Sequence, residues 1–410
     1  MGIICGLLGA NLAGSFSRDI HEMFGATNYR YYEMPEEKLD EFFKNREFHG
    51  INVTMPYKTE VMKYLDYIDD EAKAVGSVNT IIKDEEGKLK GYNTDVYGFE
   101  KAWDRAEFFV HGKKVLILGT GGASKAVEYV LKNKNAGKVV KISRTGEDNY
   151  ENLDKHYDAD FIVNATPVGM EPFEDETPVD LKLFPNLRGV FDLIYNPLRT
   201  ELILNAEELN IPCMTGLYML VAQAKRADEL FSGGTIDDRK IDSVYNAVKR
   251  NKRNLVLVGM PGSGKSTIGQ VFAKEFGLRF YDTDQMIYEL TGKTPEDILN
   301  ADGEEVFRTL ELELIKQLLE EENAVIATGG GVVTIDMGHH TIKHGSCVVY
   351  IKRALDELDL KGRPLSKKKG IEAIYNERKD LYERFSDTVI ANDSTIDDAV
   401  ERITDLLKIT

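Results

Sequence analysis

The chain has 410 residues, of which 42% are hydrophobic and 30% are charged, and its formal net charge is −17. This length predicts two or three domains, and the acidic balance argues against nucleic acids and anionic membranes as partners. Cys5, Cys213 and Cys347 are isolated in the sequence, and no apolar run is long enough to span a bilayer. We therefore expect a cytoplasmic protein with reduced thiols.

Polar side chains follow short apolar runs throughout the first hundred residues. In chain order they are Ser15, Ser17, Asn52, Thr54, Lys58, Asn79, Asn93, Thr94 and Asp95. Taken alone, each of these residues could simply stabilise a turn. Open α/β sheets, however, bind their ligands at strand ends, so the repeated occurrence of polar residues at strand ends favours a ligand site. Lys58 and Asp95 suit the transfer of an alcohol proton, with the carboxylate orienting the ammonium group; the alternative is a plain salt bridge.

A glycine-rich turn follows the strand expected at Val115–Leu118 and precedes a helix. It reads Gly119-Thr120-Gly121-Gly122-Ala123, with Ser124 where the dinucleotide fingerprint has its third glycine. A second strand, expected at 138–144, follows at the spacing of a βαβ unit. It ends in Ser143-Arg144-Thr145, and a cation beside two hydroxyls favours the 2′-phosphate of NADP over NAD.

Two helices are expected next, at 215–231 and at 235–253. Gln223 lies near the apolar face of the first helix, although an exposed polar position is the alternative. The second helix runs into a basic junction without a Pro- or Ser-rich linker. We place a domain boundary between Lys249 and Asn254.

The segment Gly259–Ser266 reads GMPGSGKS and fits the phosphate-loop pattern G-x-x-x-x-G-K-[ST]. An apolar strand, 254–258, precedes it, and a helix that ends at Gly277 follows it. In such a loop Lys265 reaches the β- and γ-phosphates and the Ser266 hydroxyl is a ligand of Mg²⁺. The alternative is an ordinary glycine-rich turn between a strand and a helix.

Charged residues after this loop suit phosphoryl transfer to a small acid. Asp284 could orient or deprotonate the acceptor hydroxyl, and Asp282 could hold the metal directly or through water. Arg308 and Arg378 could clamp an acidic substrate, and Arg363, in a short basic loop, suits a lid. For any single arginine, a surface ion pair is the alternative.

The histidines at 339, 340 and 344 could suggest a metal site, but no cysteine or carboxylate completes it. We expect a solvated turn at this position.

Taken together, these motifs resemble two families. Residues 1 to about 250 look like shikimate dehydrogenase, with SFS, NVTMPYK, VNT, NTDVYGF, GTGGAS, SRT, NATPVGM, YNP and GLYMLVAQ in that family's order. Residues 252–410 look like shikimate kinase, with GMPGSGKST, DTD, GEEVFR, ATGGG, RPL and the R-x-x-L-Y segment at Arg378. Gly14 and Arg18 depart from the histidine and proline of the first family, which bears on fine substrate specificity.

The first resemblance implies an α/β fold with a split substrate domain, residues 1–100 and 216–249, and a Rossmann-like NADP domain, residues 101–215. The catalytic group would be Lys58, paired with Asp95. The residues that would bind the substrate are Ser15, Ser17, Thr54, Asn79, Asp95 and Gln223. The residues that would hold the cofactor are Gly119, Gly121, Gly122 and Ala123 at the pyrophosphate and Ser143, Arg144 and Thr145 at the 2′-phosphate.

The second resemblance implies a P-loop kinase domain with a parallel sheet at 252–410. Its nucleotide and Mg²⁺ would be served by Gly262, Ser263, Gly264, Lys265, Ser266, Thr267, Asp282 and Arg363. Its acceptor, shikimate, would contact Asp284, Arg308, Gly329, Gly330, Gly331 and Arg378.

The hypothesis is thus one chain with two consecutive activities. The first would reduce 3-dehydroshikimate to shikimate with NADPH, and the second would phosphorylate the new 3-hydroxyl with MgATP. Two rival readings stay open: a quinate/shikimate dehydrogenase joined to another small-metabolite kinase, and a non-catalytic sensor of shikimate. The sequence leaves the oligomeric state open.

Overall fold

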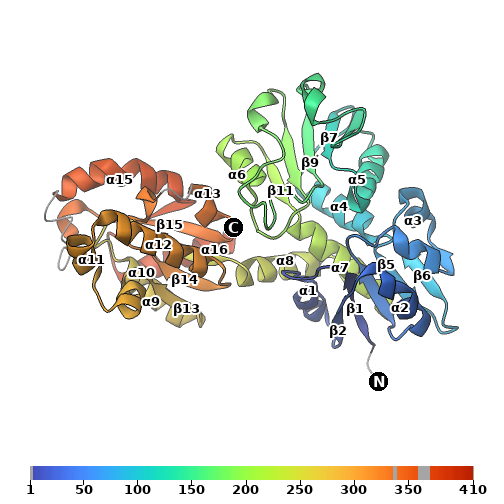
Figure 1. Cartoon of the computed structure of the whole chain (residues 1–410), viewed down its shortest axis with the longest axis horizontal. Helices are drawn as coiled ribbons and strands as arrows, with labels where there is room; N and C mark the ends of the chain where they lie inside the picture. Colours follow the sequence, from blue (N-terminus) through green and yellow to red (C-terminus); the bar gives the residue numbers. More distant parts are fainter. Residues whose placement is uncertain (1–2, 336–338, 359–369, 410) are drawn as a thin grey trace. The chain divides into compact units, whose positions relative to one another are not determined.

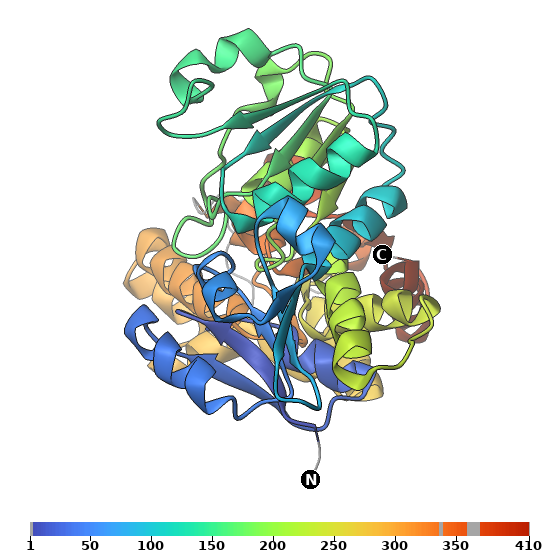
Figure 2. The same ribbon diagram turned by 90° about the vertical axis from the view of Figure 1, so that its right-hand side faces the viewer.

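The computed structural model describes residues 3–335, 339–358 and 370–409. The chain forms two compact units, Met1–Lys249 and Arg250–Thr410, which are described separately below (Figures 1 and 2). Within the described residues, no helix combines the length and the apolar character that crossing a membrane requires.

The first unit begins with a mixed sheet in the order β2-β1-β3-β5-β6-β4. Its strands are β1 (Cys5–Gly9), β2 (Tyr29–Glu33), β3 (Gly50–Val53), β4 (Tyr67–Ile68), β5 (Thr80–Lys83) and β6 (Leu89–Tyr92). β1 pairs in parallel with β2 and β3, whereas β5 runs antiparallel to β3 and β6. The helical segments of this part are α1 (Ser17–Phe24), η1 (Glu36–Lys38), α2 (Leu39–Asn45), η2 (Glu60–Tyr64) and α3 (Asp70–Val75).

A second sheet of the same unit is wholly parallel and has the order β11-β10-β9-β7-β8. Its strands are β7 (Lys114–Leu118), β8 (Lys138–Ile142), β9 (Phe161–Asn164), β10 (Gly189–Asp192) and β11 (Cys213–Thr215). β8 and β9 lie on opposite sides of β7, so the strand order reverses there, which is where such sheets bind ligands. The expected strand 138–144 is two residues shorter, because Ser143 and Arg144 already belong to the following turn.

Helices cover both faces of this second sheet. One face shares a core with α4 (Thr94–Arg105), α5 (Gly122–Asn133), α7 (Leu217–Ser232) and α8 (Arg239–Asn251), and the other shares a core with η3 (Tyr150–His156), η4 (Leu181–Leu183) and α6 (Glu201–Glu208). Residues of α7 also reach the first sheet, where Phe231 packs against the cluster that contains Cys5 and Leu7 of β1. The two sheets of this unit therefore share the α7 helix.

The second unit is a five-stranded parallel sheet in the order β13-β14-β12-β15-β16. Its strands are β12 (Asn254–Val258), β13 (Arg279–Asp282), β14 (Ala324–Ala327), β15 (Ser346–Lys352) and β16 (Thr388–Ala391). Successive side chains of the central β12 point to opposite faces: Leu255 and Leu257 enter one core, and Val256 and Val258 the other.

The helices of the second unit divide between these two cores. The first core contains α9 (Lys265–Phe276) and α16 (Ile396–Ile409). The second contains α10 (Thr283–Thr291), α11 (Pro295–Ala301), α12 (Glu304–Leu319), η5 (Val332–Thr334), α13 (His339–Lys343), η6 (Leu355–Glu357) and α15 (Ile371–Phe385). The α/β fold class predicted from the sequence is confirmed, with a Rossmann-like sheet in one unit and a parallel phosphate-loop sheet in the other.

The expectation of a solvated turn at the histidines was wrong. Residues 339–343 form α13, and His340 and His344 are 7% and 8% exposed. The helix packs against β15 and α15, with Ile342 fully buried. Apolar packing of this short helix, which polar composition alone did not reveal, removes the two imidazoles from solvent.

Candidate functional sites

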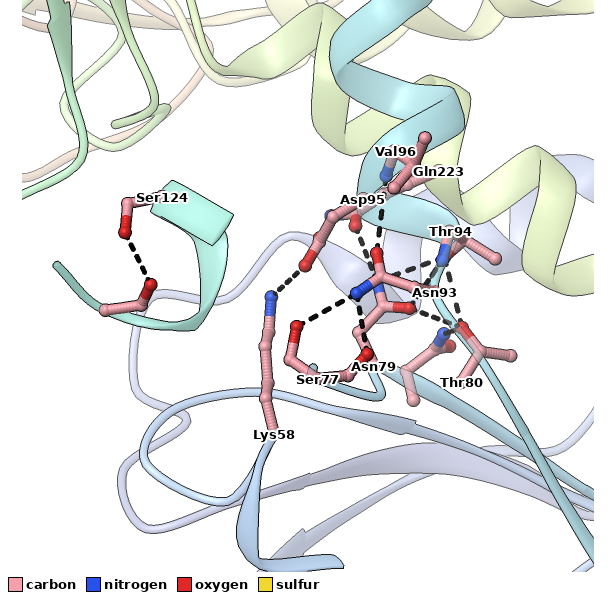
Figure 3. Close-up of polar contacts among 12 residues, drawn as sticks. Lys58, Ser77, Asn79, Thr80, Asn93, Thr94, Asp95, Val96, Ser124 and Gln223 are labelled. Carbon is pink, nitrogen blue, oxygen red and sulfur yellow. Dashed lines mark hydrogen bonds and ion pairs between the residues drawn. The ribbon is translucent and has the colours of Figure 1, made fainter. Parts of the chain in front are cut away.

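Lys58 and Asp95 meet beyond the C-terminal ends of strands β3 and β6 of the first sheet, as the pair that the sequence predicted. Lys58 follows β3, Asp95 lies in the first turn of α4, and Lys58 Nζ is 2.6 Å from Asp95 Oδ2 (Figure 3). The Asp95 side chain is 1% exposed and that of Lys58 14%, so water screens this pair poorly. A buried carboxylate thus holds one ammonium group in a fixed place.

Asn93 fixes the turn that carries Asp95. Its Oδ1 accepts from the N–H of Val96 at 3.3 Å, which caps α4. Its Nδ2 donates to the carbonyl and hydroxyl oxygens of Ser77, at 2.8 and 3.0 Å (Figure 3). Sequence reasoning noted Asn93 only as one polar residue among several; its place just before a helix was the signal for a capping role.

The orientation of the Asn79 amide is determined by the backbone. Its Oδ1 accepts from the N–H of Thr94 at 2.7 Å, and a backbone N–H can only donate. Nδ2 of Asn79 therefore donates to Gln223 Oε1 at 3.0 Å and to Thr94 Oγ1 at 3.1 Å (Figure 3). One lone pair of Gln223 Oε1 is engaged by Asn79, which turns the Gln223 NH₂ group away from Asn79 and leaves its N–H groups as donors for a ligand.

The other expected substrate residues follow two strands of the first sheet: Ser15 and Ser17 lie just before and at the start of α1, after β1, and Thr54 lies after β3. Ser15 Oγ donates to Ser17 Oγ at 3.2 Å, while Thr54 follows β3 and is half-buried. Among the hydrogen bonds of the described residues, none joins these three side chains to Lys58 or Asn79. The loop of Ser15 is instead tied to the second sheet, because Asn196 Nδ2 donates to the carbonyl of Gly14 at 3.3 Å.

The glycine turn after β7 brings Lys58 against the start of α5. Gly119 has a φ of +104°, and a Cβ at Gly122 would lie 3.4 Å from Cβ and Cδ of Lys58. α5 starts at Gly122 without a side-chain cap, and Ser124 Oγ donates back to the Gly121 carbonyl at 2.7 Å (Figure 3). A backbone cradle at an uncapped helix start suits a pyrophosphate, so these residues fit a dinucleotide.

The turn after β8 carries the residues expected at a 2′-phosphate. Ser143 Oγ accepts from the N–H of Gly146 at 2.7 Å and closes the turn. Arg144 and Thr145 are exposed at its tip. The hydroxyl hydrogen of Ser143 stays available as a donor, and the turn presents one cation, which fits a phosphate group.

A buried carboxylate that sequence reasoning missed lies at the ends of β9 and β10. Asp192 is fully buried and accepts from Thr200 Oγ1 at 2.7 Å, from the N–H of Ile194 at 3.0 Å and from Asn164 Nδ2 at 3.1 Å. Burial raises the pKa of Asp192 to about 6, although these three hydrogen bonds oppose the rise. The network ties together the loops that follow two neighbouring strands.

In the second unit, the loop after β12 has the conformation that a phosphate loop needs. Gly259, Gly262 and Gly264 have φ values of +147°, +85° and +98°. Lys265 is 6% exposed, and its Nζ donates to the carbonyls of Gly259 and Met260 at 2.9 and 3.0 Å. The loop therefore curls around its own lysine, which fits a polyphosphate cradle.

Neighbouring side chains complete the nucleotide end of this loop. Ser263 is fully buried, and its carbonyl accepts from Asn392 Nδ2 at 2.8 Å. Ser266 and Thr267 are exposed in the first turn of α9, which starts without a side-chain cap. Asp282 caps α10 by accepting from the N–H of Gln285 at 3.1 Å. The exposed Ser266 hydroxyl and the half-buried Asp282 carboxylate are oxygen donors of the kind that Mg²⁺ prefers.

Two of the three glycines after β14 lie against charged side chains. A Cβ at Gly329 would lie 2.4 Å from Glu311 Oε1 and 2.9 Å from Asp284 Oδ1. A Cβ at Gly331 would lie within 2.4 Å of three atoms of the Arg308 guanidinium. Only glycine permits these approaches, so the triple glycine brings Asp284 and Arg308 to one place.

Glu311 is the residue of this cluster that sequence reasoning missed. It is fully buried in α12 and accepts from Arg308 Nη1 at 2.5 Å. Burial raises the pKa of its carboxyl, and the charge of Arg308 opposes the rise. The spacing i, i+3 from Arg308 on a helix was the available signal.

Several buried polar atoms around the triple glycine have no hydrogen-bond partner among the described residues. They are Arg308 Nε, Arg378 Nε and Glu311 Oε1. Arg378 is 3% exposed and its Nη1 donates to the Gly330 carbonyl at 2.9 Å. Unpaired buried polar atoms cost free energy, so the two arginine donors fit an anionic group of a ligand, whereas Glu311 Oε1 is an acceptor and fits a hydroxyl group. Arg363, the expected lid residue, lies outside the described residues.

Comparisons with known proteins match each unit to a different family. A family model for the shikimate dehydrogenase substrate binding domain matches residues 7–81, and a model for shikimate kinase matches residues 261–408. The shikimate dehydrogenase (NADP(+)) of Clostridium beijerinckii is 36% identical over 262 residues, covering 59% of this chain and 96% of the relative.

Solved structures agree for the first unit. Shikimate dehydrogenase 1 of Peptoclostridium difficile has 37% identity and a TM-score of 0.57, covering 60% of this chain and 97% of that one. The shikimate 5-dehydrogenase of Thermus thermophilus, in complex with NADP(H) and shikimate, has 31% identity and a TM-score of 0.54, covering 60% of this chain and 99% of that one.

Proposed function

We propose, for a chain that belongs to the shikimate dehydrogenase family and also carries a shikimate kinase domain, that it performs two consecutive steps of the shikimate pathway. The first unit is an NADP-dependent oxidoreductase, and the second is a kinase that uses ATP and Mg²⁺. The finer assignment is that 3-dehydroshikimate is reduced to shikimate and that the new 3-hydroxyl is then phosphorylated. The substrates are thus small acids made and consumed by the same chain.

In the reductase, Lys58 Nζ would deliver the proton to the carbonyl oxygen of the substrate. Asp95 holds that ammonium in place at 2.6 Å, and the stem of Lys58 lies against the start of α5. The NADPH nicotinamide would supply the hydride. The remaining substrate-binding groups would be Ser15, Ser17, Thr54, Asn79 and Gln223, with the last donating N–H groups to a substrate oxygen.

Residues of the glycine turn would orient the cofactor. Gly119, Gly121, Gly122 and Ala123 would hold the pyrophosphate at the start of α5. The turn of Ser143, Arg144 and Thr145 would bind the 2′-phosphate. The exposure of Arg144 favours this role, because its guanidinium can contact a ligand without giving up packing against other residues.

In the kinase, Lys265 and the backbone of Gly262, Ser263 and Gly264 would neutralise phosphate charge, with Thr267 beside them. Ser266 and Asp282 would hold Mg²⁺. Asp284 would orient the acceptor hydroxyl or take its proton, and Arg308 and Arg378 would bind the carboxylate of shikimate together with Gly329, Gly330 and Gly331. Arg363 is proposed as the lid cation from the sequence alone.

The domain assignment follows from these roles. We propose a dehydrogenase substrate domain at 1–100 and 216–249, a cofactor domain at 101–215 and a kinase domain at 252–410. The division of the chain into compact units at Lys249 and Arg250 supports the last of these boundaries.

The observation that carries the proposal is the placement of Lys58. One ammonium group is paired with a buried carboxylate and packed against a dinucleotide-type helix start. A sensor that binds without turnover has no need of this arrangement, so it favours catalysis over the rival of a regulator.

The test measures each activity separately on the full chain. NADPH oxidation is followed with 3-dehydroshikimate, with NADH as the comparison cofactor. In the reverse direction, NADP⁺ reduction is compared with shikimate and with quinate, and ADP formation is compared with the same two acceptors and MgATP. We expect both activities, with kcat/KM for shikimate above that for quinate in both units. A chain that binds shikimate but turns over neither substrate would instead be a sensor, and a chain that prefers quinate would be the other rival.

A further inference from the structure

The middle glycine of the triple glycine lies between the phosphate loop and α15. A Cβ at Gly330 would lie 2.6 Å from Cγ and Cδ of Pro261, which belongs to the phosphate loop. Gly330 therefore touches the nucleotide side of the kinase unit, while its neighbours Gly329 and Gly331 touch Asp284 and Arg308. Its backbone therefore lies between the phosphate loop and the side chains expected to bind the acceptor.

The carbonyl of Gly330 accepts two hydrogen bonds from α15. One comes from Arg378 Nη1 at 2.9 Å, and the other from the hydroxyl of Tyr382, one helical turn further on. A carbonyl oxygen has two lone pairs, so both are used. The orientation of the peptide between Gly330 and Gly331 is consequently fixed from two directions.

The side chain of Tyr382 is held in place by the residues packed around it. Its side chain is fully buried and stacks on Tyr350 of β15, with ring centroids 5.0 Å apart. Burial raises the pKa of Tyr382 to about 12, so its hydroxyl remains a proton donor at neutral pH. Arg378, in contrast, has an Nε without a hydrogen-bond partner among the described residues, 3.9 Å from Glu377 Oε1, and its guanidinium can be drawn toward a bound anion.

Because Arg378 can move and Tyr382 is held by packing, the Gly330 carbonyl benefits from a second hydrogen-bond donor. A Gly330 carbonyl held by Arg378 alone would shift whenever the guanidinium moved onto a ligand. In a planar trans peptide the C=O and the next N–H point in opposite directions, so fixing the Gly330 carbonyl also aims the N–H of Gly331. Neither that N–H nor the N–H of Gly330 donates to another residue in the described ranges, so both can serve a ligand.

We propose that Tyr382 is a positioning residue of the kinase reaction: its hydroxyl holds the Gly330–Gly331 peptide at a fixed angle, so that the backbone N–H groups and Arg378 can engage the acceptor together. The proposal deepens the function proposed above and rests on shikimate being the acceptor. It assigns to the tyrosine of the R-x-x-L-Y segment a role in acceptor binding that is separate from packing.

The test is Tyr382→Phe, which removes one hydroxyl and keeps the ring stacked on Tyr350. Tyr375→Phe is the matched control, because Tyr375 lies on the same helix and its hydroxyl bonds to none of the described residues. Each variant is assayed as the full chain for kcat, for KM of shikimate and of MgATP, and for its thermal midpoint. Binding of ADP is measured in parallel.

We expect Tyr382→Phe to raise KM for shikimate by roughly five- to twentyfold, the effect of losing one buried hydrogen bond that orients a binding group. KM for MgATP, ADP binding and reductase activity should change less than about twofold, and Tyr375→Phe should behave as wild type. An unchanged KM for shikimate, or equal losses toward both substrates that follow a lower thermal midpoint, would show that Tyr382 only packs.

The same experiment separates this inference from the proposed function. If wild-type protein does not phosphorylate shikimate, the proposed function is wrong and the Tyr382 role falls with it. If wild type phosphorylates shikimate and Tyr382→Phe does so with the same KM, only the positioning role is wrong.

Discussion

The two proposed active sites differ in how far they are assembled before a ligand arrives. In the reductase unit, Lys58 is already paired with Asp95, and the amides of Asn79 and Gln223 already bond to each other. In the kinase unit, by contrast, the side chains of Arg308, Arg378 and Glu311 each have a buried atom without a hydrogen-bond partner in the described part of the chain.

Two buried carboxylates show the same contrast. Both oxygens of Asp192 in the first unit accept hydrogen bonds, whereas Glu311 in the second has one oxygen bonded to Arg308 and the other without a partner among the described residues. We infer from this difference that a hydride-transfer site can be rigid before its ligands bind, since it has to hold one proton donor at one angle. A phosphoryl-transfer site depends more on the charges that the ligands bring.

Replacing Lys58 should have the largest effect, because Lys58 is the proton donor that we propose for the reductase site. Lys58→Ala should lower reductase kcat by roughly 10²–10⁴, the usual size of a general acid contribution, with kinase turnover unchanged. The control is Lys73→Ala, which breaks an exposed ion pair with Asp70. Loss of both activities in a folded Lys58→Ala protein would contradict two independent sites.

Replacing Lys265 tests the kinase side of the comparison. Lys265→Ala should lower kinase kcat by roughly 10²–10³, since one positioned charge at the transferring phosphoryl is removed. NADPH oxidation should be unaffected. Steady-state ADP formation with saturating shikimate measures the change, and a reductase rate that fell equally would mean that the loop lysine supports the fold of the whole chain.

Replacing Arg144 tests whether this exposed residue binds the 2′-phosphate of the cofactor. Arg144 is exposed, so Arg144→Ala should leave stability unchanged and raise KM for NADPH by roughly tenfold, while KM for NADH changes little. The ratio of the two KM values is the measurement. Lys141→Ala, which breaks an ion pair between the preceding strand and Glu128, serves as the control. A parallel change in both cofactors would place the 2′-phosphate elsewhere.

The smallest expected effect concerns the fully bonded carboxylate. Burial raises the pKa of Asp192 to about 6, above the value of about 3.9 in an unfolded chain. The folded form therefore binds the proton more tightly, and this contribution to stability, present at low pH, is lost as the pH rises through about 6.

Asp192→Asn removes that titration. Between about pH 5 and about pH 7.5, the stability of wild type relative to the variant should fall by on the order of 1 kcal/mol. Thermal unfolding of the transition that NADPH shifts is the readout. A stability difference that did not vary with pH would mean that Asp192 is ionised across this range.

The sequence predicted the parts of these sites that local patterns determine. The phosphate loop and the glycine turn were recognisable because their glycines need positive φ values between a strand and a helix. The pairing of Lys58 with Asp95 followed from their positions at strand ends. Roles that depend on tertiary contacts were not predicted from the sequence. Asp192 and Tyr382 form hydrogen bonds with segments dozens of residues away, and the burial of Glu311 depends on the glycines after β14.

The prediction for the histidine segment was wrong for a related reason. Its polar letters indicated a turn in solvent, whereas Ile342 and the surrounding core bury His340 and His344. Burial of a polar residue is decided by what packs over it, and a single sequence does not contain that information locally.

The central claim is that the hydroxyl made by the first unit is the one phosphorylated by the second. The most direct measurement incubates the full chain with 3-dehydroshikimate, NADPH and MgATP, and follows NADPH loss and ADP formation at the same time. The account predicts that ADP forms only after NADPH is oxidised and reaches the same total amount, with no ADP when NADPH is omitted. ADP formation without NADPH, or NADPH oxidation that yields no phosphorylated product, would contradict it.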